Sequence, residues 1–101
     1  MEIIYSDNAE KDLAYWNKHG TQSDKNKIKT LLQSMSETPF DGVGKPEALK
    51  YDLSGYWSRR IDKKHRIIYR VMSDRIEIVS FRGHYINDVL LINQLTKPPN
   101  F

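Results

Sequence analysis

The chain contains no cysteine, which excludes a disulfide framework and any metal site built on thiolate ligands. It has no signal-like apolar run near its first residues and no stretch of about twenty apolar residues, the length that spans a bilayer. We therefore expect a cytoplasmic protein with no membrane partner. With 101 residues, 39% hydrophobic and 29% charged, the sequence has the size and composition of one small globular domain.

Familiar catalytic motifs are also missing. The stretch Gly42–Pro46 has neither the spacing of a Walker phosphate loop nor the Ser/Thr that would bind magnesium, and no GxSxG motif occurs. The histidines His19, His65 and His84 lack metal-ligand spacing, so we expect no metal site. A lone histidine is more often structural than catalytic, so both interpretations stay open for His84.

Positive charge is distributed unevenly within the formal net charge of +3. Residues 1–44 carry five Lys/Arg against seven Asp/Glu, residues 45–70 carry eight against three, and residues 71–101 carry three of each. The middle block therefore has a net charge of +5. Such a block between neutral flanks is typical of a phosphate-binding surface. A solvated, charged sheet face would give the same pattern, so local detail has to decide.

The N-terminal part of the chain predicts one strand and two helices. Residues 2–5 are β-branched and aromatic, which favours a strand. The first helix follows and ends at Gly20, and the second carries one apolar stripe at i, i+3, i+4, i+7 spacing and ends at Thr38–Pro39. Ser6 or Asp7 can cap the first helix, and the second helix is predicted to start near Ser23 or Asp24. The stripe consists of Ile28, Leu31, Leu32 and Met35.

Three further strands are predicted at residues 56–61, 65–72 and 75–82, and Ser73–Asp74 links the last two as a hairpin. The element order is β-α-α-β-β-β. This order predicts an α+β domain in which two N-terminal helices pack on one face of a mostly antiparallel sheet.

Alternation along these strands places two arginines on one side of the sheet. Ile67 and Tyr69 share the apolar phase and should face the helices, so Arg66 points to the opposite, open face. The phase of Trp57 likewise puts Arg60 on the open face. Convergent arginines on an open sheet face fit a phosphate site. Two unrelated surface arginines are the alternative.

Three residues on this basic surface have the chemistry needed for metal-free RNA cleavage. Glu47 follows the Gly/Pro-containing loop, Arg66 lies in a strand, and His84 ends the last strand. RNA cleavage needs one group to remove a 2′-hydroxyl proton, a cation to stabilise the phosphorane, and an acid to protonate the departing 5′-oxygen. Residue types alone do not distinguish this set from coincidence.

Four sequence blocks occur in a specific order: Thr38–Glu47 (TPF-x-G-x-GKPE), Leu53–Ile61 (LSG-x-WSRRI), His65–Tyr69 (HR-x-x-Y) and His84–Tyr85. In combination they resemble the YoeB branch of the RelE/ParE toxin superfamily. The resemblance implies a RelE-like microbial RNase fold over residues 1–85. It further implies a toxin of a type II toxin–antitoxin pair that enters the A site of a translating ribosome, cuts the mRNA there and halts translation.

The resemblance also implies roles for individual residues, with no metal or other cofactor. Glu47 corresponds to the general base, Arg66 to the transition-state cation and His84 to the general acid, while Tyr85 helps to hold the substrate. The positions suited to RNA contacts are Lys45, Lys50, Arg59 and Arg60.

The implied partners are the ribosome with its mRNA, a cognate YefM-like antitoxin whose disordered C-terminal segment covers the basic face, and a second copy of the chain in a homodimer. A non-catalytic toxin-fold module is the alternative, acting as an antitoxin-bound corepressor or as a gyrase inhibitor. Family chains of this type end at the tyrosine that corresponds to Tyr85. Here residues 86–101 continue as an extension of unknown role.

Overall fold

The structure, a computed structural model, describes residues 1–83. His84, Tyr85 and the extension 86–101 lie outside the described residues, and so do the predictions made for them. No helix in the described part of the chain is long and apolar enough to cross a membrane. The helices are α1 (Asp7–His19) and α2 (Gln22–Glu37), with a short 3₁₀ helix, η1, at Tyr51–Leu53. The strands are β1 (Glu2–Tyr5), β2 (Glu47–Ala48), β3 (Trp57–Arg60), β4 (Arg66–Val71) and β5 (Arg75–Gly83).

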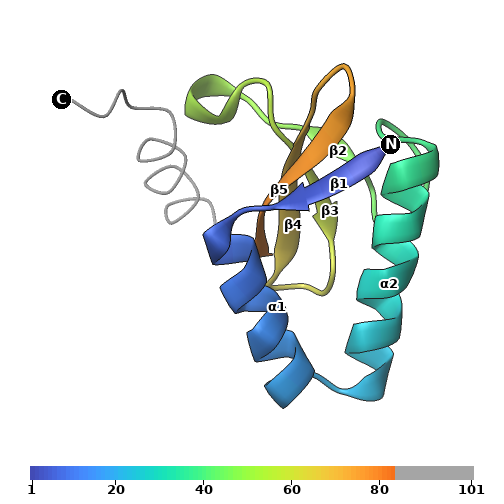
Figure 1. The fold of residues 1–101 in the computed structure, drawn as a ribbon, viewed down its shortest axis with the longest axis vertical. Coiled ribbons are helices and arrows are strands. Elements are labelled where there is room, and N and C mark those ends of the chain that lie inside the picture. Colours follow the sequence, from blue (N-terminus) through green and yellow to red (C-terminus); the bar gives the residue numbers. More distant parts are fainter. Residues whose placement is uncertain (84–101) are drawn as a thin grey trace, which may run out of the picture.

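The five strands form one sheet in the order β1-β5-β4-β3-β2. β1 pairs with β5 in parallel, and the other three pairs are antiparallel. Figure 1 shows α1 and α2 as a hairpin beside this sheet. The predicted α+β class and mostly antiparallel sheet are confirmed. β2 was missed, because a two-residue strand is too short to show an alternating pattern.

The helix starts are set by side-chain caps. Ser6, one of the two predicted caps of α1, accepts a hydrogen bond from the Ala9 amide at 3.0 Å. α2 starts at Gln22, next to the predicted start near Ser23 or Asp24. Its N-cap is Thr21, whose hydroxyl accepts from the Asp24 amide at 3.0 Å, while the Asp24 carboxylate accepts from the Thr21 amide at 2.9 Å. Asp24 therefore serves as the third residue of a capping box and not as the cap itself.

The main core lies between the helices and the sheet, and the predicted strand phase is confirmed because Ile67 and Tyr69 are fully buried there. Leu32 of the predicted helical stripe is only partly buried. The opposite face is not bare, since η1 contributes Leu53 to a second, smaller apolar cluster with Tyr56, Ile68 and Val79. The main core consists of Ala9, Trp16, Ile28, Leu31, Met35, Ile61, Ile67, Tyr69, Ile76, Ile78 and Phe81.

α1 is bonded to the end of β5 beyond the point where β1 stops. The Asp12 carboxylate accepts from the amides of Phe81 at 2.9 Å and Arg82 at 3.2 Å. The Trp16 indole donates to the Phe81 carbonyl at 2.8 Å. Side chains of α1 thus supply hydrogen bonds to backbone groups of β5 that would otherwise lack a partner at the edge of the sheet.

A carboxylate between two arginines joins β4 to β5. Arg70 Nε donates to Glu77 Oε1 at 2.6 Å, and Arg75 Nε donates to Glu77 Oε2 at 2.9 Å. These hydrogen bonds, that of Arg70 first, hold the pKa of Glu77 below its ordinary value of 4.5 although partial burial opposes the shift. Because the folded pKa is the lower one, the carboxylate stabilises the fold above its unfolded pKa and loses this contribution as the pH falls through the folded pKa.

Glu77→Gln should therefore reduce stability at neutral pH more than at acid pH. We expect the difference in unfolding free energy between the parent and the variant to shrink from about pH 5 downward, measured by urea unfolding at several pH values. Asp74→Asn is the control, because its carboxylate is 71% exposed and should contribute little. A difference that is constant with pH would contradict the prediction.

Candidate functional site

Two arginines face each other on the open face of the sheet. Arg60, at the end of β3, is the register partner of Arg66, at the start of β4. Directly paired cross-strand residues point to the same face, so the prediction that these two share a side is confirmed. Arg60 is exposed and Arg66 half-buried. Within residues 1–83 neither forms an ion pair, and two adjacent cations that no carboxylate pairs with favour binding of an anion.

Glu47 reaches the same face through β2. It is the register partner of Ser58, which lies two residues before Arg60 and therefore shares its side of the sheet. The Glu47 side chain is exposed. The strand that sequence analysis missed is thus the element that brings the predicted base to the predicted cations.

Lys45 and Lys50 flank Glu47 along the chain, and both are exposed. Lys45 has a φ of 53°, the left-handed conformation that non-glycine residues adopt rarely. The loop before it lies against β3, because the Arg60 amide donates to the Gly44 carbonyl at 2.8 Å. Two exposed lysines close to Glu47 in the chain add positive charge near it.

The prediction that Arg59 contacts RNA is wrong for the folded chain, because its side chain is fully buried. Arg59 lies in β3 between two open-face residues, Ser58 and Arg60, so alternation directs it to the helix side. Its guanidinium is bonded within the protein, to the Tyr69 hydroxyl among other groups. The strand phase that placed Arg60 on the open face also predicts that its neighbour Arg59 points to the helix side, and it could have excluded Arg59 from the RNA contacts.

His84 and Tyr85 lie outside the described residues, so their predicted roles stay predictions. Gly83, which precedes them, is the register partner of Arg66. In the described part of the chain no group of three or more His, Cys, Asp or Glu residues could hold a metal ion.

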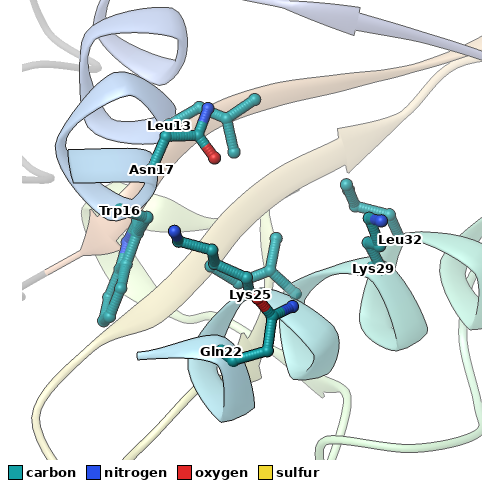
Figure 2. A pocket seen from close by; sticks show the side chains of 8 residues that line it. Leu13, Trp16, Asn17, Gln22, Lys25, Lys29 and Leu32 are labelled. Carbon is teal, nitrogen blue, oxygen red and sulfur yellow. The ribbon is translucent and has the colours of Figure 1, made fainter. Parts of the chain in front are cut away.

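A groove lies between the two helices, on the side of the sheet away from these residues. Figure 2 shows Leu13 and Trp16 of α1 facing α2 across it, with Lys25 and Lys29 of α2 at its border. Its volume is about 310 Å³. None of the predicted site residues lines it, so it is separate from the candidate site. The complete lining is Leu13, Trp16, Asn17, Gln22, Lys25, Ile28, Lys29 and Leu32.

Comparison with known proteins identifies the family. The family model described as "YoeB-like toxin of bacterial type II toxin-antitoxin system" matches residues 5–85. Toxin YoeB of Escherichia coli (strain K12) is 44% identical over 85 residues, which cover 84% of this chain and 100% of that protein.

Solved structures agree with this match. A YoeB/ParE toxin from Agrobacterium tumefaciens has a TM-score of 0.78 at 39% identity, covering 84% of this chain and 100% of that one. YoeB from Staphylococcus aureus, 38% identical, has TM-scores of 0.74 in a heterotetrameric complex with YefM and 0.76 as a dimer, covering 84% of this chain and 98% of that one. The chain therefore belongs to the family of YoeB-like toxins of bacterial type II toxin–antitoxin systems.

Proposed function

We propose that this toxin is a ribosome-dependent endoribonuclease that cuts mRNA in the A site and so stops translation. The observation that carries the proposal is the pair of Arg60 and Arg66, which face each other across β3 and β4 on the side of the sheet that also presents Glu47. Paired guanidinium groups bind phosphate through several hydrogen bonds. A carboxylate beside such cations can act as a base on a bound hydroxyl.

The proposed reaction is a transesterification within the RNA. Glu47 removes the proton of a 2′-hydroxyl, whose oxygen attacks the adjacent phosphorus. Arg66 stabilises the additional negative charge of the phosphorane, and His84 gives a proton to the departing 5′-oxygen. The products are a 2′,3′-cyclic phosphate and a 5′-hydroxyl. Tyr85 helps to hold the substrate, and Lys45, Lys50 and Arg60 contact the RNA backbone. The scheme uses no metal ion.

The proposed partners follow from the same surface and from the relatives. YoeB of Staphylococcus aureus assembles with YefM and also forms a dimer. We infer that this chain likewise forms a homodimer and binds a YefM-like antitoxin. An acidic segment of that antitoxin would cover the basic open face and compete with mRNA for it.

The test is cleavage of mRNA on ribosomes that hold a defined codon in the A site, with the cut mapped by primer extension. We expect the full chain to cut the natural message. A message with one 2′-deoxynucleotide at the mapped position should stay intact there, because the attacking hydroxyl is missing. The same assay on a chain truncated after Tyr85 tests the influence of residues 86–101.

The alternative, a non-catalytic corepressor or gyrase inhibitor, predicts a different result. The chain would then arrest growth while leaving ribosome-bound message intact, or would slow DNA supercoiling by gyrase in vitro. Cleavage that proceeds equally well at the 2′-deoxynucleotide would exclude the proposed chemistry.

A further inference from the structure

Arg59 is a buried cation whose partners are neutral. Its side chain has no exposure to solvent, and among residues 1–83 it forms no ion pair with a carboxylate. Burying an unpaired charge is costly unless many hydrogen bonds replace its water. An apolar side chain would avoid the cost of desolvating a charge, but it would make none of these hydrogen bonds. The role of Arg59 is therefore to be found in the groups that its hydrogen bonds hold in place.

Those bonds hold one loop. Arg59 Nη2 donates to the carbonyls of Thr38 at 2.6 Å and Asp41 at 2.8 Å, and Nη1 donates to the carbonyl of Val43 at 3.1 Å. The three acceptors span the segment between α2 and β2. Nη1 also donates to the Ser34 hydroxyl of α2 at 2.8 Å. The planar guanidinium presents five donors in a fixed arrangement, whereas a lysine ammonium has three and cannot reach all these acceptors together.

Two further side chains complete this arrangement. Tyr69 of β4 accepts from Arg59 Nε at 3.1 Å and donates to the Pro39 carbonyl at 2.9 Å. Burial raises the pKa of Tyr69 although its hydrogen bond with Arg59 opposes the shift, so the hydroxyl keeps the proton it donates. The Ser34 hydroxyl also accepts from the Val43 amide at 3.3 Å. Each side chain therefore contacts both Arg59 and the loop.

The loop packs closely against this support. Gly42 and Gly44 have φ values of 110° and 86°, which side chains other than glycine rarely tolerate. A Cβ at Gly44 would overlap Leu31 Cδ2, and one at Gly42 would overlap the Ser34 hydroxyl. The loop is thus packed directly against α2 and Arg59.

This geometry continues to Glu47. The Gly44 carbonyl accepts from the Arg60 amide, and three residues later Glu47 pairs with Ser58. The backbone of Arg59 lies between these two pairing points, while its side chain crosses to the other side of the sheet and holds the loop. Arg59 therefore connects the loop that follows α2 to β2, the strand that carries the proposed base Glu47.

We infer that Arg59 is a positioning residue, whose buried guanidinium fixes loop 38–46 so that Glu47 is held at the reacting 2′-hydroxyl. The inference rests on the proposed function of Glu47. A base displaced by about 1 Å can lose roughly 100-fold in rate. The RNA-cleaving site would thus depend on a side chain that never contacts RNA.

The test uses Ser34→Ala, which removes one acceptor of Arg59 and one anchor of the loop while leaving Arg59 in place. We expect the rate of single-turnover cleavage at saturating ribosomes to fall about 10-fold, with unchanged ribosome affinity. In a Glu47→Ala background the same change should have less than about a twofold effect, because the base is already gone. Ile76→Val, in the main core on β5, is the control for a general loss of stability, and its rate should match that of the parent.

Amide hydrogen exchange gives a second readout that does not depend on cleavage. Exchange in Ser34→Ala should accelerate at residues 40–47 and stay unchanged in β4 and β5. Exchange that accelerates equally everywhere, exchange that stays unchanged in the loop, or a rate loss of the same size in the Glu47→Ala background would each overturn the inference. If the parent cuts no message, the proposed function fails, and the exchange pattern alone still supports or overturns the fixing of the loop by Arg59.

Discussion

Replacing Arg66 with alanine is expected to lower the rate of mRNA cleavage on the ribosome by about 100-fold or more. Arg66 is half-buried at the start of β4 and opposite Arg60, so its guanidinium is held on the open face by a strand rather than by a loop. A fixed cation interacts more strongly with the phosphorane than with the ground-state phosphate, because negative charge accumulates as the 2′-oxygen attacks. The measurement is single-turnover cleavage at saturating ribosome concentration.

Lys27→Ala is the matched control for Arg66→Ala. It removes one positive charge from the exposed surface of α2, away from the open face, and should leave the single-turnover rate within about twofold. Arg66→Lys should fall between the parent and Arg66→Ala, since it keeps the charge but loses the paired donors. The role assigned to Arg66 is wrong if Arg66→Ala cuts as fast as the control.

Replacing Arg59 with methionine is expected to destabilise the fold by about 3 kcal/mol or more. Methionine fills similar space but donates no hydrogen bond, so the carbonyls of Thr38, Asp41 and Val43 lose the guanidinium as a donor. Most of this cost comes from the five hydrogen bonds that the charged Arg59 side chain makes within residues 1–83, since bonds to a charged group contribute more than neutral ones. For a domain of this size the melting temperature should fall by roughly 15 °C, measured by circular dichroism.

Arg60→Met is the comparison for stability. The two arginines are adjacent in β3, yet Arg60 is exposed and Arg59 has no exposure. We expect Arg60→Met to change the unfolding free energy by less than about 0.5 kcal/mol. Equal destabilisation by both substitutions would show that the hydrogen bonds of Arg59 contribute little.

Most of the fold could be predicted from local patterns. Both α2 and β4 bury one face. Apolar residues therefore recur about every 3.6 positions in the helix and every 2 positions in the strand. The start of α2 was predicted near Ser23 or Asp24 and lies at Gln22, where the reciprocal hydrogen bonds of Thr21 and Asp24 cap the helix. β2 could not be predicted, since two residues paired to β3 carry no period of their own.

The candidate site was predictable to the extent that strand phase determines it. The alternation of side chains along the strands placed Arg60 and Arg66 on the same face, and their pairing across β3 and β4 confirms this prediction. Motif similarity alone treated Arg59 and Arg60 as equivalent, although adjacent strand residues face opposite sides. The burial of Arg59 depends on carbonyls 16 to 21 residues away in the sequence, and no local pattern contains that information.

The parallel pairing of β1 with β5 also has a consequence for synthesis of the protein. The first strand and first helix are made early, but their partners are among the last described residues, and the Ser6 hydroxyl reaches the Val79 carbonyl across 73 residues of sequence. Contacts of such sequence separation form late. A nascent chain therefore cannot complete its sheet until β5 has been synthesised, so the first strand and helix stay without their partners through most of the translation of the described residues.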